Sequence, residues 1–439
     1  MKIAQFKVEN LFNSFTHVID FKNETGITLM LGQNGLGKTV MLNLIKSIFS
    51  YNFDKVLDVC FSKVVITFDN NNKIELEQRI EKDNIHDLIF YYYEKDNLIS
   101  QDSLHAMAEN SDKAMREIRE YILPYYRRFD ENEWVDRRSG ERCTTNELIL
   151  LHNDLIPKEI LTKWRKYPIW LTDVIDLFNV NLIETQRLLT TVQIEERYSR
   201  PHKEYRNTVE EYSKELLAEI NAKLASSTEL AAKLDRTYPN RLIDRLKNIS
   251  DISQKDLNCK LNDLEIKRKR LSIVGLIDLK EEPVLQSISN QEKAIKEVLL
   301  VYIDDSNKKL EVYDSLADKI ELLMRIINSR FLFKKLSINR DTGFNFVSTK
   351  NGQPIDLNKL SSGEQHMLIL FYQLLFKYSS QTLLLIDEPE ISLHISWQKR
   401  FIEDLQQILK LNSMEILIAT HSPSIIGKNW GLTVDLDKA

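Results

Sequence analysis

Residues Gly32 to Thr39 read Gly-Gln-Asn-Gly-Leu-Gly-Lys-Thr. The spacing is that of a phosphate-binding loop, in which a glycine is followed by four residues and then by Gly-Lys-Thr. An apolar, β-prone run at 27–31 precedes the loop, and a helix-prone run at 41–48 follows it. Because this is the strand–loop–helix setting that the motif requires, we favour a nucleotide-binding α/β fold over a chance glycine turn.

The side chains and backbone of this loop predict how phosphate is held. The glycines let backbone N–H groups close around phosphate oxygens, and the helix N-terminus adds a favourable dipole. Lys38 is expected to reach the β- and γ-phosphates, and the Thr39 hydroxyl to bind Mg²⁺. Asn34, Gly35 and Gly37 complete the predicted ATP-binding loop.

Composition narrows the class of protein further. The 439 residues are too many for one ordinary core, so we expect two or three subdomains. A net charge of -5 argues against a protein that coats nucleic acid with its whole surface, although a local basic patch stays open. No apolar run has the length of a membrane span, and residues 1–20 do not read as a signal peptide. The cysteines at 60, 143 and 259 show neither metal-ligand spacing nor a disulfide framework, so a reducing cytoplasm is the expected location.

The residue pattern divides the chain into five predicted segments. Strands at 3–8, 64–68 and 74–78 indicate antiparallel β-structure beside the phosphate loop. The predicted segments are an N-terminal ATPase lobe at 1–85, a helical insertion at 86–178, a return to the lobe at 179–203, a helical arm at 204–330 and a C-terminal lobe at 331–439.

The insertion is rich in aromatic and basic residues, such as those at 91–93, 125–128 and 164–166. Interleaved aromatic and arginine side chains can hold nucleic acid by stacking and phosphate pairing. The same residues also occur in ordinary cores with solvated edges, and we favour that structural interpretation because such aromatics are usually buried. The segment is also a candidate partner surface.

The arm shows helical periodicity with apolar residues on one face. One such face carries Val209, Tyr212, Leu216, Ile220 and Leu224, and another carries Tyr313, Leu316, Ile320, Leu323 and Ile327. Pro239 and Pro283 are expected to punctuate the region. A helix of about 40 residues would reach about 60 Å, so we expect packed or paired helices in a short arm. An ordinary bundle without reach shows the same spacing and remains the alternative.

The C-terminal lobe alternates predicted strands with polar motifs. Candidate strands at 331–338 and 344–347 precede Leu360–Gln365, which leads into an apolar helix at 367–376. A buried-strand run at 382–386 ends in Asp387 and Glu388, and the run at 416–419 leads into His421. Earlier in the chain, the β-prone run 180–183 leads into Gln186 and Arg187. Gln186 is a candidate Mg²⁺ ligand, whereas Arg187 also fits an ordinary salt bridge.

Taken together, these motifs resemble those of the ATP-binding-cassette (ABC) ATPase family, in the branch shared with SMC, RecF and OLD-type proteins. Gly32–Thr39 matches the Walker A loop, and Leu383–Glu388 matches Walker B with its catalytic glutamate. Leu360–Glu364 resembles the signature motif Leu-Ser-Gly-Gly-Glu but departs from it at Ser362. The resemblance covers about residues 1–85, 179–190 and 331–439, and implies an ABC-type P-loop ATPase head with a short helical or coiled-coil arm.

The same resemblance implies a role for individual residues. Asp387, Thr39 and Gln186 would hold Mg²⁺, while Glu388 would orient or deprotonate the attacking water. His421, at the switch-histidine position, would touch the γ-phosphate. Ser361 and Gly363 would present a hydroxyl and helix N–H groups to ATP. Ser392 falls at the D-loop position, and His394 is expected to start a helix rather than to act as a ligand.

The resemblance also implies an assembly and two candidate functions. In this family two copies pair head to tail and enclose two ATP molecules between the signature of one and the Walker A loop of the other. One candidate is the ATPase sensor of a bacterial anti-phage system, similar to those of Septu, related retrons and PARIS, acting with a separately encoded effector such as a nuclease. The other is a RecF-like repair ATPase that binds DNA directly. We favour the first candidate because the arm is short and the net charge is acidic. In addition, the sequence has about 18 residues after His421, too few for the C-terminal nuclease domain that OLD proteins carry. Transport is disfavoured, since no membrane domain is present in the sequence.

Overall fold

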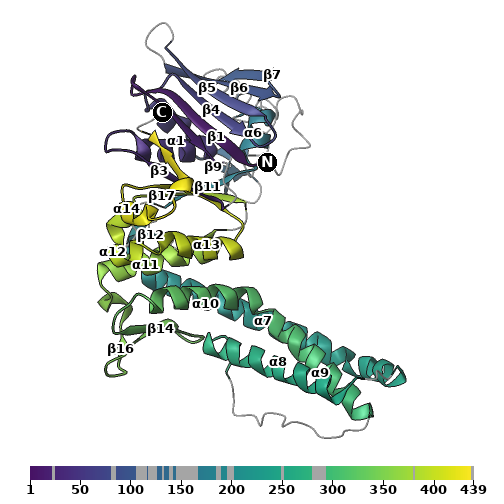
Figure 1. Cartoon of the computed structure of the whole chain (residues 1–439). Coiled ribbons are helices and arrows are strands. Elements are labelled where there is room, and N and C mark those ends of the chain that lie inside the picture. Colours follow the sequence, from purple (N-terminus) through teal and green to yellow (C-terminus); the bar gives the residue numbers. More distant parts are fainter. Residues whose placement is uncertain are drawn as a thin grey trace. The chain divides into compact units, whose positions relative to one another are not determined.

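The computed structural model forms two compact units, which we describe separately (Figure 1). Unit 1 contains Met1–Ile183, Gln381–Glu388 and Met414–Ala439, and unit 2 contains Glu184–Ser380 and Pro389–Ser413. The structure describes residues 1–21, 25–80, 86–104, 116, 126–130, 133–137, 142–144, 167–183, 189–194, 202–248, 252–278, 293–378 and 381–436.

Unit 1 contains a six-stranded sheet in which all neighbouring strands are antiparallel, in the order β2-β1-β4-β5-β6-β7. Residues alternate along these strands between a buried and an outer face, as in Val64, Ile66 and Phe68, because successive side chains point to opposite sides of a strand. The strands are β1 (Ile3–Leu11), β2 (Phe15–Asp20), β4 (Lys63–Phe68), β5 (Lys73–Ile80), β6 (His86–Glu94) and β7 (Asn97–Ser103).

A second sheet of unit 1 is parallel throughout, in the order β11-β17-β18-β3-β19. In a parallel sheet the carboxyl ends of all strands meet at one edge, where ligands bind. The loops that follow β3, β17 and β18 therefore converge at this edge. The strands are β3 (Ile27–Leu31), β11 (Asn179–Ile183), β17 (Thr382–Asp387), β18 (Glu415–Ala419) and β19 (Thr433–Asp435), and four of them are the strands predicted from the sequence.

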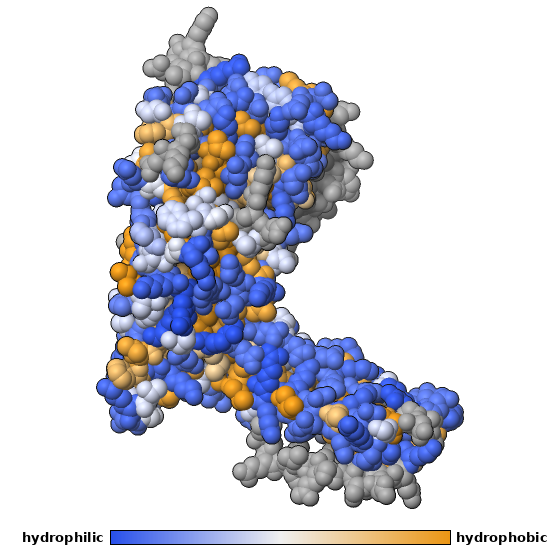
Figure 2. Space-filling view, viewed as in Figure 1, coloured by the Kyte–Doolittle hydropathy of each residue, from blue (hydrophilic) through white to orange (hydrophobic). Residues whose placement is uncertain are grey.

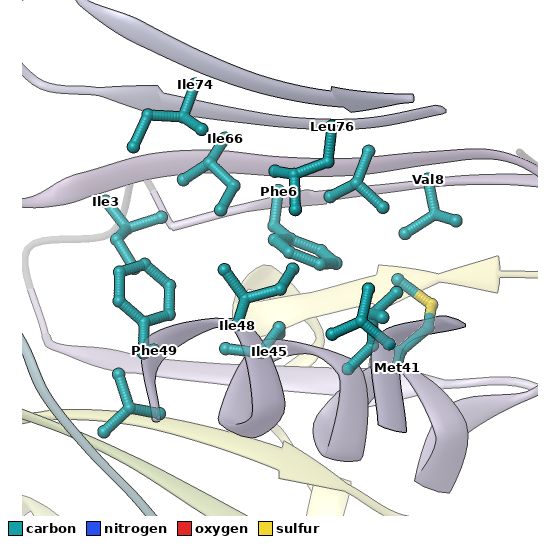
Figure 3. Close-up of a cluster of buried hydrophobic side chains, with 14 of the residues drawn as sticks. Ile3, Phe6, Val8, Met41, Ile45, Ile48, Phe49, Ile66, Ile74 and Leu76 are labelled. Atoms are coloured by element: carbon teal, nitrogen blue, oxygen red, sulfur yellow. The ribbon is translucent and has the colours of Figure 1, made fainter. Parts of the chain in front are cut away.

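Helix α1 (Lys38–Phe49) packs against both sheets of unit 1. Figure 3 shows Met41, Ile45 and Ile48 of this helix facing Phe6 and Val8 of the antiparallel sheet. All five side chains are buried, and burying one such side chain contributes roughly 1.5–3 kcal/mol. This packing holds the first turn of α1 at the edge of the parallel sheet. Unit 1 also contains the short helices α2 (Phe53–Leu57), α14 (Pro423–Ile426) and η4 (Trp430–Leu432).

The described part of 86–178 contains more strand than the predicted helical insertion. Strands β6 and β7 extend the antiparallel sheet beyond the predicted lobe boundary at residue 85, because Leu88, Phe90 and Tyr92 alternate into the core. Tyr126 and Trp134 are also buried, so these aromatics pack as the structural interpretation predicted. Residues 151–166 lie outside the described part of the chain. The remaining elements are β8 (Tyr126–Arg128), β9 (Glu133–Asp136), β10 (Arg142–Thr144) and α6 (Ile169–Ile175).

The predicted arm is helical and belongs to unit 2. Helix α7 (Thr208–Lys247) has 40 residues, which corresponds to about 60 Å. Helices α8 (Gln254–Ile273) and α9 (Lys293–Glu311) pack through a small apolar core. That core contains Leu257, Leu261, Leu264, Leu300 and Ile303. The face of the arm seen in Figure 2 is mostly hydrophilic.

Pro239 lies inside α7 and does not end it, contrary to the sequence prediction. A proline in a helix lacks one hydrogen bond and strains the preceding turn. Arg241 supports this turn by donating to the Leu234 carbonyl oxygen at 2.9 Å and pairing with Asp305 of α9. Tertiary contacts to α9 therefore hold the helix together across the proline. Pro283 lies outside the described residues.

The second apolar face predicted for the arm is used for internal packing. Helix α10 (Asp314–Asn328) contacts α11, α13 and β14, and all five predicted residues from Tyr313 to Ile327 are buried. The interpretation of this face as ordinary packing is therefore confirmed, and the face offers no partner surface.

The rest of unit 2 surrounds the predicted signature. The strand predicted at 331–338 begins later, at Lys334, because Phe333 has a left-handed φ of 63° that a strand cannot continue through. The strands are β12 (Leu189–Ile194), β13 (His202–Asn207), β14 (Lys334–Asn339), β15 (Gly343–Ser348) and β16 (Pro354–Ile355). The helices are η1 (Leu357–Lys359), α11 (Ser362–Tyr372), η2 (Gln373–Lys377), η3 (Pro389–Ser392), α12 (Ile395–Gln398) and α13 (Phe401–Leu411). Across the described ranges, no helix combines the length and the apolar character needed to cross a bilayer.

Candidate active site

The phosphate loop lies between β3 and α1, as the sequence predicts. Gly37 precedes the helix with a left-handed φ of 85°, and a Cβ added there would lie 2.8 Å from Leu11 and 3.1 Å from Phe12. Gly35 has a φ of 92° and open space on its Cβ side. Gly37 therefore lets the loop pack on the β1–β2 hairpin. Gly35 leaves the loop backbone accessible to a ligand.

Lys38 is folded into this loop. Its Nζ donates to the carbonyl oxygens of Gly32 at 2.9 Å and Gln33 at 3.1 Å, and the residue is 5% exposed. The positive charge of Lys38 also interacts with the carboxylate of Asp387. A buried ammonium inside a phosphate loop fits a triphosphate, whose oxygens would accept charge-assisted hydrogen bonds from it.

His17 of β2 supports the loop from behind. Its Nε2 lies 2.9 Å from the Leu36 carbonyl oxygen, so this nitrogen donates the hydrogen bond. The imidazole is 1% exposed and stacks on Phe15, with ring centroids 5.7 Å apart. A buried, packed donor fixes the carbonyl that immediately precedes Gly37, and so orients the loop backbone toward phosphate.

We expect His17→Phe to raise the KM for ATP about three- to tenfold, with a smaller change in kcat. Losing a buried hydrogen-bond donor costs about 1–3 kcal/mol, and part of this free energy would otherwise hold the loop in its phosphate-binding conformation. Steady-state kinetics at several ATP concentrations measure the two constants. His17→Gln offers a side-chain N–H in a similar place and should restore part of the affinity. Equal losses in both variants, with an unchanged KM, would show that His17 only fills the core.

Thr39 and Asp387 bring two oxygen ligands together. The Thr39 hydroxyl lies 3.2 Å and 2.9 Å from the two carboxylate oxygens of Asp387, and so joins the first turn of α1 to the end of β17. Burial raises the pKa of the Asp387 carboxyl, whereas the hydrogen bond from Thr39 and the positive charge of Lys38 oppose that rise. An alcohol and a carboxylate are the donors that Mg²⁺ prefers, so the pair fits this ion. Protonation as the pH falls through the raised pKa would weaken metal binding.

Glu388 and His421 complete the group at this edge. His421 Nε2 lies 3.5 Å from a carboxylate oxygen of Glu388, and the two side chains are 32% and 28% exposed. Glu388 has a left-handed φ of 41°, and its N–H donates to the Ala419 carbonyl oxygen at 2.9 Å. A non-glycine residue in this conformation stores backbone strain, which is found mainly at functional sites. The hydrogen bond to Ala419 of β18 stabilises this conformation, in which the Glu388 side chain lies beside His421.

The signature residues lie in unit 2 at the start of α11. The Ser361 hydroxyl accepts from the Glu364 N–H at 3.4 Å, and the Glu364 carboxylate accepts from the Ser361 N–H at 2.7 Å. These two bonds form a capping box, which is a structural use of the Ser-Ser-Gly-Glu pattern. Burial raises the pKa of the Glu364 carboxyl, but hydrogen bonds from Lys334 and Ser361 outweigh it and hold the pKa below its ordinary value. Ser361 remains exposed, and Gly363 lies in the first helical turn.

Four further residues singled out in the sequence have different outcomes. Gln186 and Arg187 lie outside the described residues, so the prediction of Gln186 as a metal ligand stays a prediction. Ser392 lies in η3, and its side chain is likewise outside the described part. His394 caps α12 by accepting from the Ser396 N–H, which confirms it as a helix-start residue. The supports from His17 and Lys334 were missed, because neither residue belongs to a motif and each acts across a distance in sequence.

This parallel sheet, phosphate loop and carboxylate pair define a P-loop nucleotide-binding protein. The sequence profile of the AAA ATPase domain (AAA_15) matches residues 1–426, so the chain belongs to this family. The predicted α/β P-loop fold is confirmed, and the family membership confirms the predicted ATPase class.

Individual known proteins show more limited similarity. UvrABC system protein A of Aquifex aeolicus (strain VF5) is 32% identical over 97 residues, which are 22% of this chain and 10% of that protein. The chain thus spans 10% of the length of this curated relative. The Smc head domain of Pyrococcus furiosus, bound to the C-terminal domain of ScpA, has a TM-score of 0.33 and 14% identity, with 97% of this chain and 91% of that chain covered. The SMC head domain of Thermotoga maritima has a TM-score of 0.33 and 10% identity, with the same coverage.

Proposed function

We propose that this chain binds and hydrolyses ATP with Mg²⁺ and acts as the switch of a bacterial anti-phage defence system with a separately encoded effector. The observation that carries the ATPase proposal is the edge of the parallel sheet in unit 1. There Thr39 lies within hydrogen-bond distance of Asp387, and Glu388 adjoins both Asp387 and His421. Phosphoryl transfer to water needs such a combination of metal ligands and a carboxylate base.

Each residue of this edge has a chemical task in the proposal. Lys38 and the loop N–H groups bind phosphate oxygens, and Thr39 and Asp387 hold Mg²⁺, which neutralises charge on those oxygens. Glu388 orients a water molecule and accepts its proton. His421 contacts Glu388 and is placed to hydrogen-bond the terminal phosphate, so its contacts change once that phosphate leaves.

The proposed switch requires a second copy of the chain. The exposed start of α11, with Ser361 and Gly363, offers N–H groups and a positive dipole end to phosphate. ATP held by the loop of one copy and capped by α11 of another would draw the two copies together. Hydrolysis would then release them, which gives two states with different affinity for an effector.

The end of α11 lies against the base of the arm, which supports a route for this change. Tyr212 of α7 stacks on Tyr372, with ring centroids 4.6 Å apart, and its hydroxyl accepts from Gln373 at 2.8 Å. Lys377 pairs with Glu215 of α7 at 2.5 Å. The helix that begins beside Ser361 therefore ends in direct contact with the arm, which would carry the change to an effector.

We expect Glu388→Gln to form at least a dimer in light scattering when ATP is present, because slow hydrolysis traps the paired state. Adding Ser362→Glu should abolish this pairing, because a carboxylate at the exposed start of α11 repels phosphate. The substitution should not destabilise the helix, since a negative charge is favourable at a helix N-terminus. Ser226→Glu on the exposed arm is the matched control and should pair normally. A chain that stays monomeric in every nucleotide state would refute the shared site.

The switch proposal also predicts that the chain is not itself the effector. Purified chain with ATP and Mg²⁺ should hydrolyse ATP without cleaving DNA or RNA, and the product of a neighbouring gene should co-purify with it. Robust cleavage that Glu388→Gln abolishes would overturn this assignment. Tight DNA binding without a protein partner would favour the RecF-like repair function instead.

A further inference from the structure

A cleft in unit 2 lies beside the start of α11. It has a volume of about 540 Å³ and is lined by Ser361, Arg330, Arg400, His394, Ser396 and Trp397, among others. The cleft therefore combines the helix end proposed to meet a phosphate with two arginine side chains. None of the motifs described above includes either arginine.

Arg330 is fixed within the protein. Its side chain is 5% exposed, pairs with Asp404 of α13 and donates to the Ile326 carbonyl oxygen at 3.0 Å. Its Nε is buried and has no hydrogen-bond partner among the described residues. Burial lowers the pKa of Arg330, the charge of Asp404 opposes this effect, and the nearby positive charge of Arg400 adds to it. Arg330 thus forms part of the cleft wall and engages the carboxylate of Asp404.

Arg400 differs because it is exposed and uncommitted. It precedes α13, and its side chain makes no hydrogen bond or ion pair with the parts of the chain that the structure describes. Asp404 pairs with Arg330, and Glu364 is held by Lys334 at 2.6 Å, so both of these carboxylates are already engaged. Glu403 lines an adjoining cleft with Arg400 and Asp404. A free guanidinium beside Ser361 presents two parallel N–H donors, the geometry that matches phosphate.

The aromatic wall makes this cleft a preformed feature. Trp397 stacks on Phe331 with ring centroids 6.0 Å apart. The ring centroid of His394 also lies 6.0 Å from that of Trp397. His394 also caps α12, which holds the short helix that leads to Arg400. Little ordering is then needed when a ligand enters, and this favours binding.

We propose that Arg400 is a catalytic residue that acts in trans, on the triphosphate held by the phosphate loop of a second copy. The inference rests on the proposed shared ATP site and adds to it a guanidinium that meets the phosphate beside Ser361. Negative charge redistributes over the phosphate oxygens during transfer, so a preorganised cation there stabilises the transition state more than the bound substrate. Arg400 should therefore affect kcat more than ATP affinity.

The first experiment measures single variants of the full chain. Arg400→Ala should lower kcat at least tenfold, with a change in the KM for ATP below about threefold, because the contact strengthens in the transition state. Arg400→Lys keeps the charge but loses the paired donors, so it should restore activity only in part. Arg325→Ala is the matched control. Arg325 donates a 2.6 Å hydrogen bond to Gln407 and does not line the cleft that contains Ser361. Unchanged kcat in Arg400→Ala, with normal pairing, would overturn the inference and leave the proposed function intact.

The second experiment separates action in trans from action within one chain. Arg400→Ala and Glu388→Gln chains carry different affinity tags and are mixed before ATP and Mg²⁺ are added. The mixed assemblies that form with ATP are then isolated through both tags. One site of a mixed dimer would combine an intact Glu388 with an intact Arg400, so it should show about half the wild-type rate. Activity no higher than the mean of the two parent variants would show that Arg400 acts within its own chain.

A parallel mixture of Ser362→Glu and Glu388→Gln tests the shared site without touching Arg400. Recovery in this mixture, together with failure of the Arg400 mixture, would refute only the role of Arg400. Failure of both mixtures, with wild-type chain that does not pair, would refute the shared site and with it the inference. Thermal unfolding of each variant checks that the losses do not come from misfolding.

Discussion

Replacing Glu388 by glutamine should lower ATP turnover by about two to four orders of magnitude while leaving ATP binding close to normal, which is the range for removing a general base. A carboxylate oxygen of Glu388 lies 3.5 Å from Nε2 of His421, and Glu388 directly follows Asp387 in the chain. This position would let the carboxylate accept a proton from a water molecule at the metal site. Glutamine preserves the size of the side chain and its hydrogen-bonding ability but cannot take up that proton.

Phosphate release in the steady state measures the rate, and titration with a fluorescent ATP analogue measures binding. Glu390→Gln is the control. It makes the same chemical change two residues later in the sequence, at a residue with no proposed role in the ATP site, so it should retain most activity. Near-normal turnover of purified Glu388→Gln would remove Glu388 from the catalytic role. Loss of binding in the same variant would assign the carboxylate to metal or nucleotide affinity.

The parallel sheet of unit 1 could be predicted because its strands are short, continuous apolar runs that end in chemically distinctive residues. Strands β3, β17 and β18 are bounded by Gly32, Asp387 and His421, so each motif also marks a strand end. The antiparallel extension was harder to predict. In β6 the buried Leu88, Phe90 and Tyr92 alternate with other apolar or aromatic residues, which hides the period of two.

Hydrogen bonds between residues far apart in the sequence could not be predicted at all. His17 meets Leu36, and Lys334 meets Glu364, only because β-strand pairing and helix packing bring separate segments together. The signature shows a different difficulty, since the Ser-Ser-Gly-Glu pattern from which a phosphate contact was predicted is also a helix-capping pattern. Ser361 makes the capping bonds in this chain, and its exposed position still leaves it accessible to a second copy.

Replacing Lys38 by alanine should abolish measurable ATP binding. The Lys38 ammonium is buried and lies at the centre of the loop, where it donates to Gly32 and Gln33. Each hydrogen bond to a charged group contributes about 1.5–3 kcal/mol, so losing two phosphate contacts should weaken binding by about two to four orders of magnitude. The loop carbonyls would also lose their donor, which further disfavours the phosphate-binding conformation.

Lys46→Ala provides a control on the same helix, because Lys46 is also a lysine that donates to a carbonyl, that of Val180 at 2.6 Å. Both variants remove one lysine from α1 together with its contacts to backbone oxygens, which are two for Lys38 and one for Lys46. Saturating ATP with Mg²⁺ should raise the thermal midpoint of the wild type and of Lys46→Ala, since a ligand that binds only the folded state stabilises it. The midpoint of Lys38→Ala should not move. An equal rise in all three proteins would mean that ATP is held elsewhere, and the phosphate-loop assignment from Gly32 to Thr39 would then be wrong.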